Sequence, residues 1–420
     1  MSPCGFTSGV PTAASSRPPP PFTAEHAELR ESVRRFVANE LRPHASEWED
    51  ARWFPDEVFA KLAGVGFLGL KYPAQLGGEG GDYLHDAVFT EELSRCGSGG
   101  LAAGIGAHVG IATPPIWKSG TDEQKQRFLV PAIRGERIAA LGITEPGAGS
   151  DVAGIATKAE PVDGGWLVNG SKTFITNGVR ADFVVTAVKT TSEGGHRGLS
   201  FLVIERGMDG FEISEKLEKM GWHASDTAEL SFADVFVPEE NLLGERNGGF
   251  YLIMANFQWE RLMMALGAVG SMEAVIELTI DYARERSAFG RPVSKFQAIR
   301  HKVAEMALKL ETARAMTYHA LRLFVETGDA VAEVTMAKLQ SQRAAFEVAD
   351  DALQIHGGAG YMKEYEVERV ARDTRLGPIG GGTDEIMKEI LGKQLGPIEL
   401  RTSQLELGEQ VGRRRITSRR

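Results

Sequence analysis

The pattern of apolar and polar positions predicts helices over the first third of the chain. Apolar residues recur at intervals of three and four, as at Leu29, Val33 and Phe36, which is the spacing of one helix face. Thr23 stands just before this run, in the segment TAEH, and is predicted to be the N-cap of the first helix. The pattern predicts an N-terminal helical domain over residues 22–137.

Short runs of β-branched and aromatic residues follow, separated by glycine, asparagine and aspartate. The runs are GWLVNGSKTFITNG, ADFVVTAVKT, LSFLVIE and TAELSFADVFVP. Such runs predict strands, so residues 138–248 are expected to form a middle β domain. From about residue 249 the helical period returns and continues to residue 395. This return predicts a second helical domain over residues 249–398.

The order of these regions argues against a dinucleotide-binding fold, in which strands and helices alternate. Gly64, Gly66 and Gly69 match the GxGxxG spacing of such folds. However, a predicted helix precedes these glycines, and Tyr72 and Pro73 follow where a second helix would begin. We therefore expect no nucleotide site there.

Both ends of the chain are expected to be irregular. Residues 1–21 contain the proline-rich SSRPPPP and are predicted to be disordered. They lack the charged start and apolar run of a secretory signal. Residues 399–420 lose the apolar face and end in RRRITSRR. This basic ending favours a solvated, flexible tail over a membrane or nucleic-acid contact.

Composition narrows the classes of function. A formal net charge of -10 argues against polyanion binding, so no nucleic acid partner is expected. Cys4 and Cys96 are the two cysteines, so a disulfide framework is excluded and a cytoplasmic location is expected. The most apolar stretch, FYLIMANFQWERLMMALGAVGSMEAVIELTI, is interrupted by Glu260 and Arg261. These charges favour a buried helix of a soluble protein over a membrane span.

The segment LGITEPGAGSDVAG, at the start of the β region, closely resembles a signature of the acyl-CoA dehydrogenase family. Its glycines, such as Gly147 and Gly149, let backbone N–H groups approach a ligand. Thr144 and Ser150 supply hydroxyl groups that can reach polar atoms of a flavin. In this family the segment lies at the flavin ring, so the resemblance implies FAD as cofactor. The residues implied to contact it here are Leu141, Gly142, Ile143, Thr144, Gly149 and Ser150.

The resemblance also implies the fold class. It is an α+β multidomain fold with an N-terminal helical domain, a middle β-barrel-like domain and a C-terminal four-helix bundle. A second matching segment, GSKTFITNG, places Phe174, Ile175 and Thr176 against the flavin ring. Many relatives carry Trp where Phe174 stands. On pattern alone, an aromatic residue there is also explained by core packing.

Two further segments resemble the parts of the family that bind the remainder of FAD. In RERSAFGRPVSKFQAIR, Arg286 matches the arginine that neutralises the pyrophosphate through paired guanidinium donors. Phe289 and Gln297 match neighbouring cofactor contacts. In LQIHGGAGYMKEYEVERVARDTR the matching contacts are Gln354, Ile355, His356, Gly357 and Gly358. In this family both segments reach the FAD of a neighbouring subunit, which implies at least a dimer and, by the family norm, a homotetramer.

No metal site is expected from the sequence. His356 is the histidine that invites such an interpretation, but no cysteine, histidine or carboxylate stands around it at ligand spacing. A capping or cofactor-side role for His356 is favoured.

The family implies a glutamate that removes the α-proton of the substrate, at one of two chain positions. The first precedes Gly-Thr in a C-terminal EGT motif, and here that position is Gly381, in IGGGTDEIM. The second lies on the long helix after the β domain, within ERL, and QWERLMMA supplies Glu260. The second position is that of the long-chain and isovaleryl-CoA dehydrogenase branch. Glu260 is therefore the predicted base, although a buried salt bridge would also explain it.

The nearest rival for this role is Glu385, two residues beyond Thr383. Both are implied cofactor-side residues. The positions implied to contact the substrate are Ser150, Phe257, Arg261, Gly381 and Gly382. By the resemblance, a backbone N–H near Gly381 or Gly382 and the ribityl 2′-hydroxyl of FAD polarise the thioester carbonyl. Such oxyanion donors are often the largest catalytic contribution.

The predicted activity is FAD-dependent α,β-dehydrogenation of an acyl-CoA to the trans-2-enoyl-CoA. Glu260 takes the α-proton, flavin N5 accepts the β-hydride, and electron-transfer flavoprotein is the expected electron acceptor. An acyl-CoA oxidase or a flavin monooxygenase on the same scaffold is the alternative enzyme. A flavin-binding assembly or chaperone subunit is the non-enzymatic alternative, and it is expected to lack the base or the flavin signature, both of which are present.

The acyl group stays open at this stage. Small residues from Gly97 to Gly106 fall where relatives line the acyl tail, and they fit either a deep slot or close helix packing. The set is Gly97, Ser98, Gly99, Gly100, Ala102, Ala103, Gly104 and Gly106.

Overall fold

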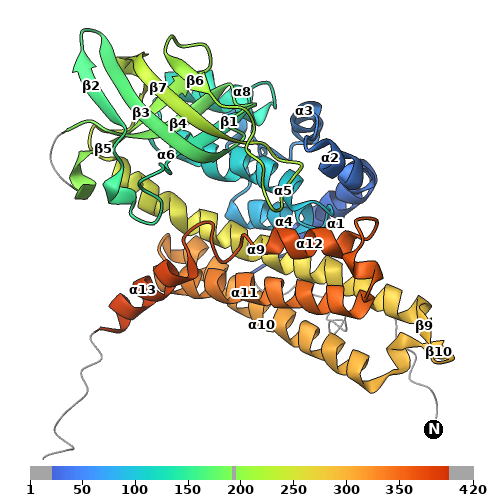
Figure 1. The fold of residues 1–420 in the computed structure, drawn as a ribbon. Coiled ribbons are helices and arrows are strands. Elements are labelled where there is room, and N and C mark those ends of the chain that lie inside the picture. The colour runs from blue at the N-terminus through green and yellow to red at the C-terminus, as the bar shows by residue number, and fades with distance from the viewer. Residues whose placement is uncertain (1–20, 192–194, 397–420) are drawn as a thin grey trace, which may run out of the picture.

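The computed structural model describes residues 21–191 and 195–396. It consists of a helical N-terminal part, a middle sheet and a helical C-terminal part, which confirms the expected fold class (Figure 1). The tails predicted for residues 1–21 and 399–420 lie, apart from residue 21, outside the described residues.

The N-terminal part is a layer of short helices. Its α-helices are α1 (Ala24–Phe36), α2 (Ala45–Ala51), α3 (Glu57–Gly64), α4 (Tyr83–Leu93), α5 (Gly99–Gly106), α6 (Thr113–Ser119), α7 (Asp122–Gln124) and α8 (Val130–Ile133). Three π-helical turns, η1 (Val37–Leu41), η4 (Ala107–Ala112) and η5 (Lys125–Leu129), and two 3-10 turns, η2 (Arg42–His44) and η3 (Ala74–Leu76), join them. Thr23 is the N-cap of α1, as predicted.

The middle part is built on an eight-stranded sheet. The strands are β1 (Ala139–Gly142), β2 (Lys158–Val162), β3 (Gly165–Thr176), β4 (Phe183–Lys189), β5 (Leu199–Glu205), β6 (Phe211–Ile213), β7 (Thr227–Pro238) and β8 (Leu242–Leu243). Their order is β6-β7-β3-β2-β4-β5-β8, and β1 pairs with β4 in parallel. The 3-10 turns η6 (Val152–Gly154), η7 (Gly195–Gly198) and η8 (Glu239–Asn241) lie between strands.

The long pairing of β3 with β7 is antiparallel and shifts register twice, the second time between Lys172 and Ile175. A register shift of this kind bends a strand and redirects a side chain. Phe174 lies within that shift.

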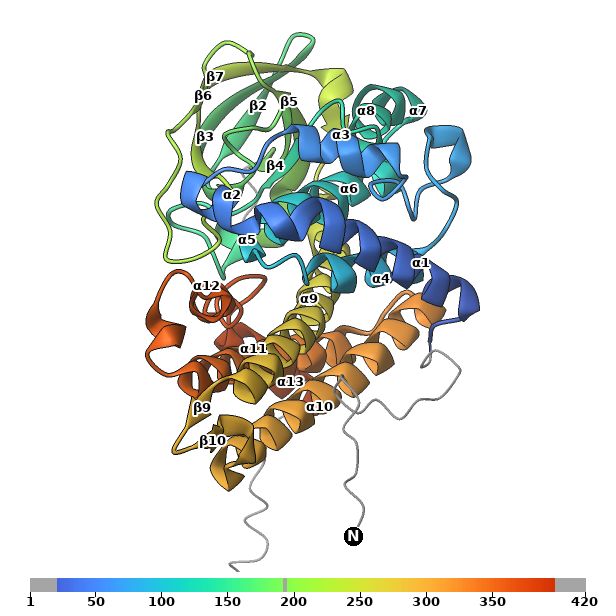
Figure 2. The ribbon, with the colours of Figure 1, turned by 90° about the vertical axis from the view of Figure 1, so that its right-hand side faces the viewer.

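The C-terminal part contains three long helices, α9 (Gly249–Glu285), α10 (Gln297–Thr327) and α11 (Val331–His356), and two shorter ones, α12 (Glu366–Thr374) and α13 (Asp384–Leu395). A small hairpin, β9 (Ser287–Ala288) with β10 (Arg291–Pro292), and the 3-10 turns η9 (Val293–Lys295) and η10 (Ala359–Tyr361) complete it. α9 packs against α10 and α11 and also against α4 of the N-terminal part. Figures 1 and 2 show α9 running from beneath the sheet to the β9-β10 hairpin at the opposite end of the bundle.

By length and composition, α9 alone among the described helices is apolar enough to cross a membrane. Half of its most apolar 18-residue segment is buried inside the protein. Its polar residues Asn256, Glu260 and Arg261 are buried as well. These features identify α9 as the central core helix, as the sequence predicted.

Candidate functional site

The structure divides the predicted site residues into two groups. The sheet-side group lies on β1 and the loop after it, on β3, on the first half of α9, and on the loop before α13 with the first turn of that helix. It contains Leu141, Gly142, Ile143, Thr144, Gly149, Ser150, Phe174, Ile175, Thr176, Phe257, Glu260, Arg261, Gly381, Gly382, Thr383 and Glu385. The hairpin-end group lies where α9 ends and α11 ends: it contains Arg286, Phe289, Gln297, Gln354, Ile355, His356, Gly357 and Gly358.

The two β-domain signatures come together through main-chain contacts. The Thr173 N–H donates to the Thr144 carbonyl over 2.8 Å. The buried ammonium of Lys172 donates to the Ile143 carbonyl over 3.1 Å and to Glu145 Oε1 over 2.8 Å. Glu145 also accepts from the N–H groups of Ala156 and Thr157. This buried ion pair anchors both ends of the glycine-rich loop, a role that the sequence did not reveal.

The surface left by this anchoring suits a flat, partly polar ligand. Phe174 has a φ of 59°, and 70% of its side chain is exposed. A non-glycine residue in the left-handed region is strained, and such strain concentrates at ligand sites. A Cβ atom added at Gly147 or Gly149 would meet nothing within 4 Å. The exposed ring, the open glycine backbone and the exposed Ser150 therefore fit the flavin ring of FAD.

The π-helical turn η4 connects the sheet to α9. His108 on η4 interacts through Nδ1 with the backbone N–H of Ala139 on β1, over 3.0 Å. The next turn of η4 presents the Ile111 carbonyl to the Asn256 side chain on α9, over 3.1 Å. Since η4 contacts both, it fixes the position of α9 relative to β1.

Glu260 lies on α9 with only 8% of its surface exposed. Among the residues that the structure describes, no cation forms an ion pair with it. Burial raises the pKa of Glu260 to about 7, against smaller lowering effects from the Asn256 amide and the Arg261 charge. The salt-bridge explanation of Glu260 is therefore not supported. A desolvated carboxylate with this pKa suits a general base near neutral pH.

Asn256 is the one hydrogen-bond donor to the Glu260 side chain among the described residues. Its Nδ2 donates to Glu260 Oε1 over 2.6 Å from one helical turn earlier. The same amide donates to the Ile111 carbonyl, so its orientation is fixed from two sides. The spacing of four residues along a helix was visible in the sequence, but the buried partner on η4 was not.

The glycine loop before α13 is held by two cations from different helices. Arg261 Nε donates to the Gly381 carbonyl over 3.4 Å. Lys338 Nζ, on α11, donates to the Gly382 carbonyl over 2.5 Å. Both glycines have positive φ, 62° and 97°. Burial lowers the pKa of Lys338 to about 8. Because the carbonyls are bound from the helix side, the conformation of the loop and the direction of its N–H groups are fixed.

Two methionines next to Glu260 on α9 pack against glycines of neighbouring segments. A Cβ added at Gly381 would lie 2.3 Å from Met264 Sδ. On the other side, a Cβ added at Gly110 would lie 2.1 Å from Met263 Sδ, and one at Gly106 would lie 3.4 Å from Met263 Cε. Flexible thioether side chains therefore fill the space between α9 and the Gly381 loop on one side and η4 on the other.

Most of the small residues around Gly100 serve packing. A Cβ at Gly100 would lie 2.8 Å from the backbone N of Ser225, and one at Gly104 would lie 2.8 Å from the Phe54 ring. Gly100 thus permits close contact of α5 with the sheet domain, and Gly104 permits close packing within the N-terminal part. Gly106 is the member of the set that faces α9.

Glu385 occupies an exposed position in the first turn of α13. Hydrogen bonds from its own backbone N–H and from Thr383 lower the pKa of Glu385. Thr383 is the N-cap, and its Oγ1 accepts from the Ile386 N–H over 3.3 Å. An exposed carboxylate of lowered pKa is a weak base, so Glu385 fits a helix-starting role better than proton removal.

The hairpin-end group is remote from Glu260. At about 1.5 Å per residue, the 26 positions of α9 from Glu260 to Arg286 span about 39 Å. Phe289 is 96% exposed and has a φ of 52°. Tyr282 stacks on His356 at 4.1 Å and donates to its carbonyl, which joins the two segments of this group. Glu260 and Arg286 of the same chain therefore lie far apart along α9.

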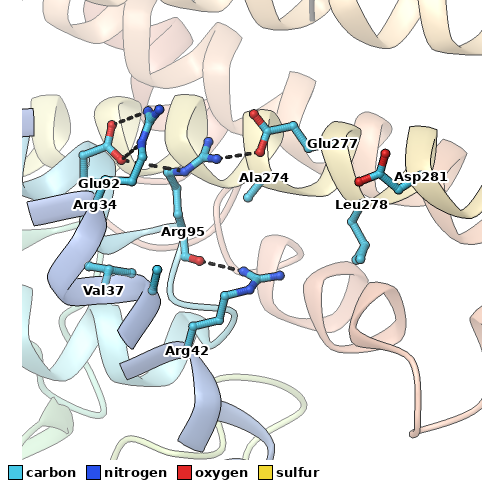
Figure 3. A pocket seen from close by; sticks show the side chains of 10 residues that line it. Arg34, Val37, Arg42, Glu92, Arg95, Ala274, Glu277, Leu278 and Asp281 are labelled. Atoms are coloured by element: carbon cyan, nitrogen blue, oxygen red, sulfur yellow. Dashed lines mark hydrogen bonds and ion pairs between the residues drawn. The ribbon is translucent and has the colours of Figure 1, made fainter. Parts of the chain in front are cut away.

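A pocket of about 250 Å³ between α1, α4 and α9 contains none of these residues (Figure 3). Its arginines are already paired, Arg34 with Glu92 and Arg95 with Glu277, while Arg42 donates to the Arg95 carbonyl. With its positive charges matched by carboxylates, this pocket offers no separate binding chemistry.

Comparisons with known proteins agree with these features. The profiles described as "Acyl-CoA dehydrogenase, N-terminal domain", "middle domain" and "C-terminal domain" match residues 23–136, 140–235 and 247–396. The chain is 38% identical over 380 residues to "Isovaleryl-CoA dehydrogenase, mitochondrial" of Solanum tuberosum, covering 89% of this chain and 91% of that protein. It is 40% identical over 378 residues to "Long-chain specific acyl-CoA dehydrogenase, mitochondrial" of Mus musculus, covering 89% of this chain and 87% of that protein.

Solved structures give the same result. A probable acyl-CoA dehydrogenase from Mycobacterium abscessus superposes with a TM-score of 0.87 at 46% identity, covering 89% of this chain and 99% of that one. Two structures bear on the cofactor and on the alternative enzyme. One is an FAD complex of PigA, with 30% identity and a TM-score of 0.86, covering 89% of this chain and 98% of that one. The other is the prolyl acyl carrier protein oxidase AnaB, with 31% identity and a TM-score of 0.85, covering 90% of this chain and 100% of that one.

Proposed function

The chain belongs to the acyl-CoA dehydrogenase family, whose activity is FAD-dependent dehydrogenation of acyl-CoAs, and we propose that its Glu260 is the base of that reaction. The product is the trans-2-enoyl-CoA. The proposal rests chiefly on the burial of Glu260 without an ion-pair partner among the described residues. A carboxylate held in this way keeps its basicity for a proton on carbon, because neither water nor a guanidinium stabilises its charge.

The sheet-side group would hold the ring end of FAD. Phe174 and Thr176 offer a ring face and a hydroxyl, and Thr144 and Ser150 offer hydroxyl groups beside them. When bound, FAD supplies the two-electron acceptor that takes the β-hydrogen of the substrate as a hydride at N5. The protein contributes the proton acceptor, the orientation of the thioester and the exclusion of water.

The glycine loop would orient the substrate. A backbone N–H near Gly381 or Gly382 is proposed to donate to the thioester carbonyl and so to acidify the α-carbon. Arg261 and Lys338 bind the carbonyls of this loop and keep it in one conformation. Such fixed donors are effective because they need no reorganisation during the reaction. Arg261 also lies over the Phe257 ring at 5.6 Å, and both residues are proposed to contact the substrate.

The hairpin-end group would hold the remainder of the FAD of another protomer. Arg286, Phe289 and Gln297 are exposed, and a Cβ added at Gly357 or Gly358 would meet nothing within 4 Å. An open surface about 39 Å from Glu260 makes sense if a second chain brings its cofactor there. We propose at least a dimer and, by the family norm, a homotetramer.

Electron-transfer flavoprotein is the proposed electron acceptor, and a cytoplasmic location remains a prediction.

An oxidase, which passes electrons to oxygen, is the second candidate because AnaB shares the fold. The rate at which air reoxidises the substrate-reduced protein separates the two, since a dehydrogenase reoxidises slowly without its acceptor.

The decisive experiment is anaerobic bleaching of the flavin by a panel of straight-chain and branched acyl-CoAs. We expect at least one acyl-CoA to bleach the wild type rapidly. Glu260→Gln should retain the yellow cofactor and bind the same substrate, but bleach about 10³-fold more slowly or worse. Glu385→Gln tests the rival carboxylate and should bleach far faster than Glu260→Gln. Normal bleaching of Glu260→Gln would refute the assignment of the base.

A further inference from the structure

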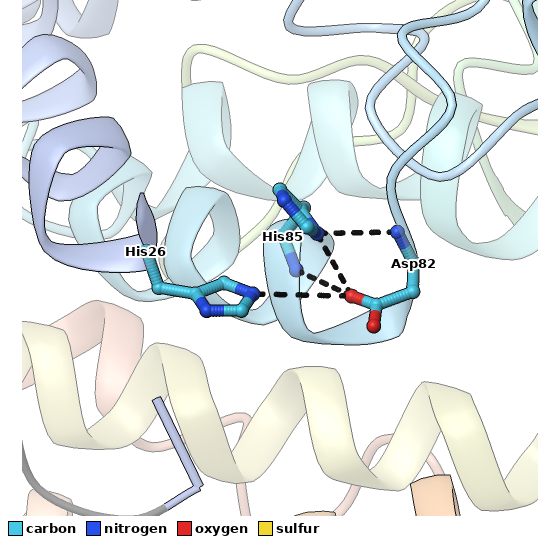
Figure 4. A group of neighbouring side chains, drawn as sticks. All are labelled: His26, Asp82 and His85. Carbon is cyan, nitrogen blue, oxygen red and sulfur yellow. Dashed lines mark hydrogen bonds and ion pairs between the residues drawn. The ribbon is translucent and has the colours of Figure 1, made fainter. Parts of the chain in front are cut away.

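A cluster of two histidines and an aspartate lies outside both groups of site residues. His26 on α1 and His85 on α4 face each other with ring centroids 4.4 Å apart, and Asp82 lies beside both rings (Figure 4). One ligand atom from each of the three side chains lies within 4.8 Å of the other two. Two imidazoles and a carboxylate are a common donor set for divalent transition metals.

Capping of the two helices holds these side chains in place. Thr23 caps α1, and its N–H and Oγ1 contact His26 Nδ1 over 3.2 and 2.8 Å. Asp82 caps α4 by accepting from the N–H groups of Leu84 and His85, and its Oδ1 also lies 2.8 Å from His85 Nδ1. Both histidines stand at the third position of their helix. The same capping arrangement on two helices therefore brings both rings together.

The capping contacts leave one atom of His26 without a partner among the described residues. His26 is only 4% exposed, and its Nε2 has no hydrogen-bond partner among the described residues. That atom points toward Asp82 Oδ1, 4.0 Å away. A buried polar atom without a partner is costly, so a missing partner is expected there. Unlike His26, the Asp82 side chain is about half exposed, which provides a route from solvent.

We propose that His26, Asp82 and His85 bind a divalent transition metal ion of the zinc, cobalt or nickel class. His26 coordinates through Nε2, and its ring proton then resides on Nδ1. Nδ1 gives up the hydrogen bond that it accepts from the Thr23 N–H and donates to Thr23 Oγ1 instead, an outer contact of the kind that fixes a ligating imidazole. Glu25, whose Oε1 lies 3.6 Å from His85 Nε2, or water completes the coordination.

Metal binding would join two helices that are far apart in the chain. α1 and α4 pack against each other, and α4 packs on α9. Tyr83, between Asp82 and His85, contacts Trp259 with ring centroids 4.6 Å apart. Trp259 directly precedes Glu260 in the chain. The ion would therefore stabilise the helix that supports this part of α9, without contacting substrate or cofactor.

The test is metal binding by the flavin-loaded protein, free of any histidine tag and stripped with EDTA. Zn²⁺ is titrated by calorimetry, and Co²⁺ by its visible absorption. Glutamine accepts the same hydrogen bond at the third position of a capping box, so His26→Gln and His85→Gln remove ligands while keeping the caps. His319→Gln, at an exposed histidine on α10, is the matched control.

We expect one ion per chain, a higher melting temperature with Zn²⁺, and affinity about tenfold to a hundredfold lower in either ligand variant. The His319→Gln protein should bind as the wild type does. Flavin reduction should proceed at the wild-type rate in the metal-free His26→Gln protein, since these residues lie outside the site. Zn²⁺ affinity that is equal in wild type and both ligand variants would overturn the proposal, and so would absence of binding.

Discussion

The Asn256 amide nitrogen lies 2.6 Å from Glu260 Oε1, one helical turn before it on α9. Within the described structure, this contact is the one hydrogen bond to a carboxylate that is buried and has no ion-pair partner. The hydrogen bond lowers the pKa of Glu260, but burial raises this pKa by more, so that its value is about 7. Asn256 is therefore a positioning residue that sets the pH range in which the base is ionised.

The rate of flavin reduction should rise with pH around 7 in the wild type, because only ionised Glu260 accepts a proton. Asn256→Leu removes a hydrogen bond to a charged group, worth about 1.5 to 3 kcal/mol. The pKa of Glu260 should then rise by about 1 to 2 units. Stopped-flow reduction across pH 5.5 to about 9 measures the midpoint. An unshifted midpoint in Asn256→Leu would show that the contact does not act on the base.

Stability should also depend on the charge of Glu260. Its pKa in the folded protein, about 7, is above the ordinary value of 4.5. Protonated Glu260 therefore makes its full contribution to the free energy of unfolding below pH 4.5. This contribution is lost as pH rises through 7. Glu260→Gln, which stays neutral, should gain up to about 3 kcal/mol relative to wild type between pH 5 and pH 8. Melting of both flavin-loaded proteins at the two pH values tests this, and a constant difference would contradict it.

Moving the base to the other family position should need a third change. Gly381 has a φ of 62°, and a Cβ there would lie 2.3 Å from Met264 Sδ. Overpacking of this kind costs about 1 to 3 kcal/mol. Glu260→Gly with Gly381→Glu should therefore recover little reduction, and adding Met264→Ala should raise the rate about tenfold. The Met264→Ala single variant is the control. Equal rates in the double and triple variants would show that Met264 is no obstacle.

Removing the Lys338 ammonium should loosen the glycine loop. Lys338→Met leaves the Gly382 carbonyl without its donor. We expect kcat to fall about tenfold to a hundredfold, less than when an oxyanion donor is deleted outright, with a smaller change in KM. Lys338→Arg, which keeps a donor, should recover part of kcat. A change in KM alone would assign Lys338 to substrate binding instead.

Subunit sharing predicts complementation between two inactive variants. Glu260→Gln and Arg286→Ala should each be inactive as pure oligomers. In a mixed pair, one site keeps Glu260 of one chain and Arg286 of the other, so activity should reach up to about half of wild type. Co-expression with two different tags and purification on both isolates the mixed species. Activity no higher than that of the parents would place Arg286 and Glu260 at unconnected sites.

The sequence by itself determined the features that depend on neighbouring letters. The spacing of apolar residues gave two helical regions around a β region, and Thr23 was correctly predicted as an N-cap. The segments around Thr144, Phe174, Arg286 and His356 identified the family, and the absence of a carboxylate at Gly381 directed attention to Glu260. Short-range patterns carry this information because helix faces, caps and glycine turns are local structures.

Only the tertiary structure decided what surrounds these residues. The burial of Glu260 comes from packing of α9 against other helices, and burial is what raises its pKa. The support of Gly382 by Lys338 joins α11 to the loop before α13. The meeting of His26 with His85 depends on how α1 packs on α4. These contacts join residues that are distant in the chain, and the long, straight α9 keeps Glu260 and Arg286 apart, so no local pattern could have revealed them.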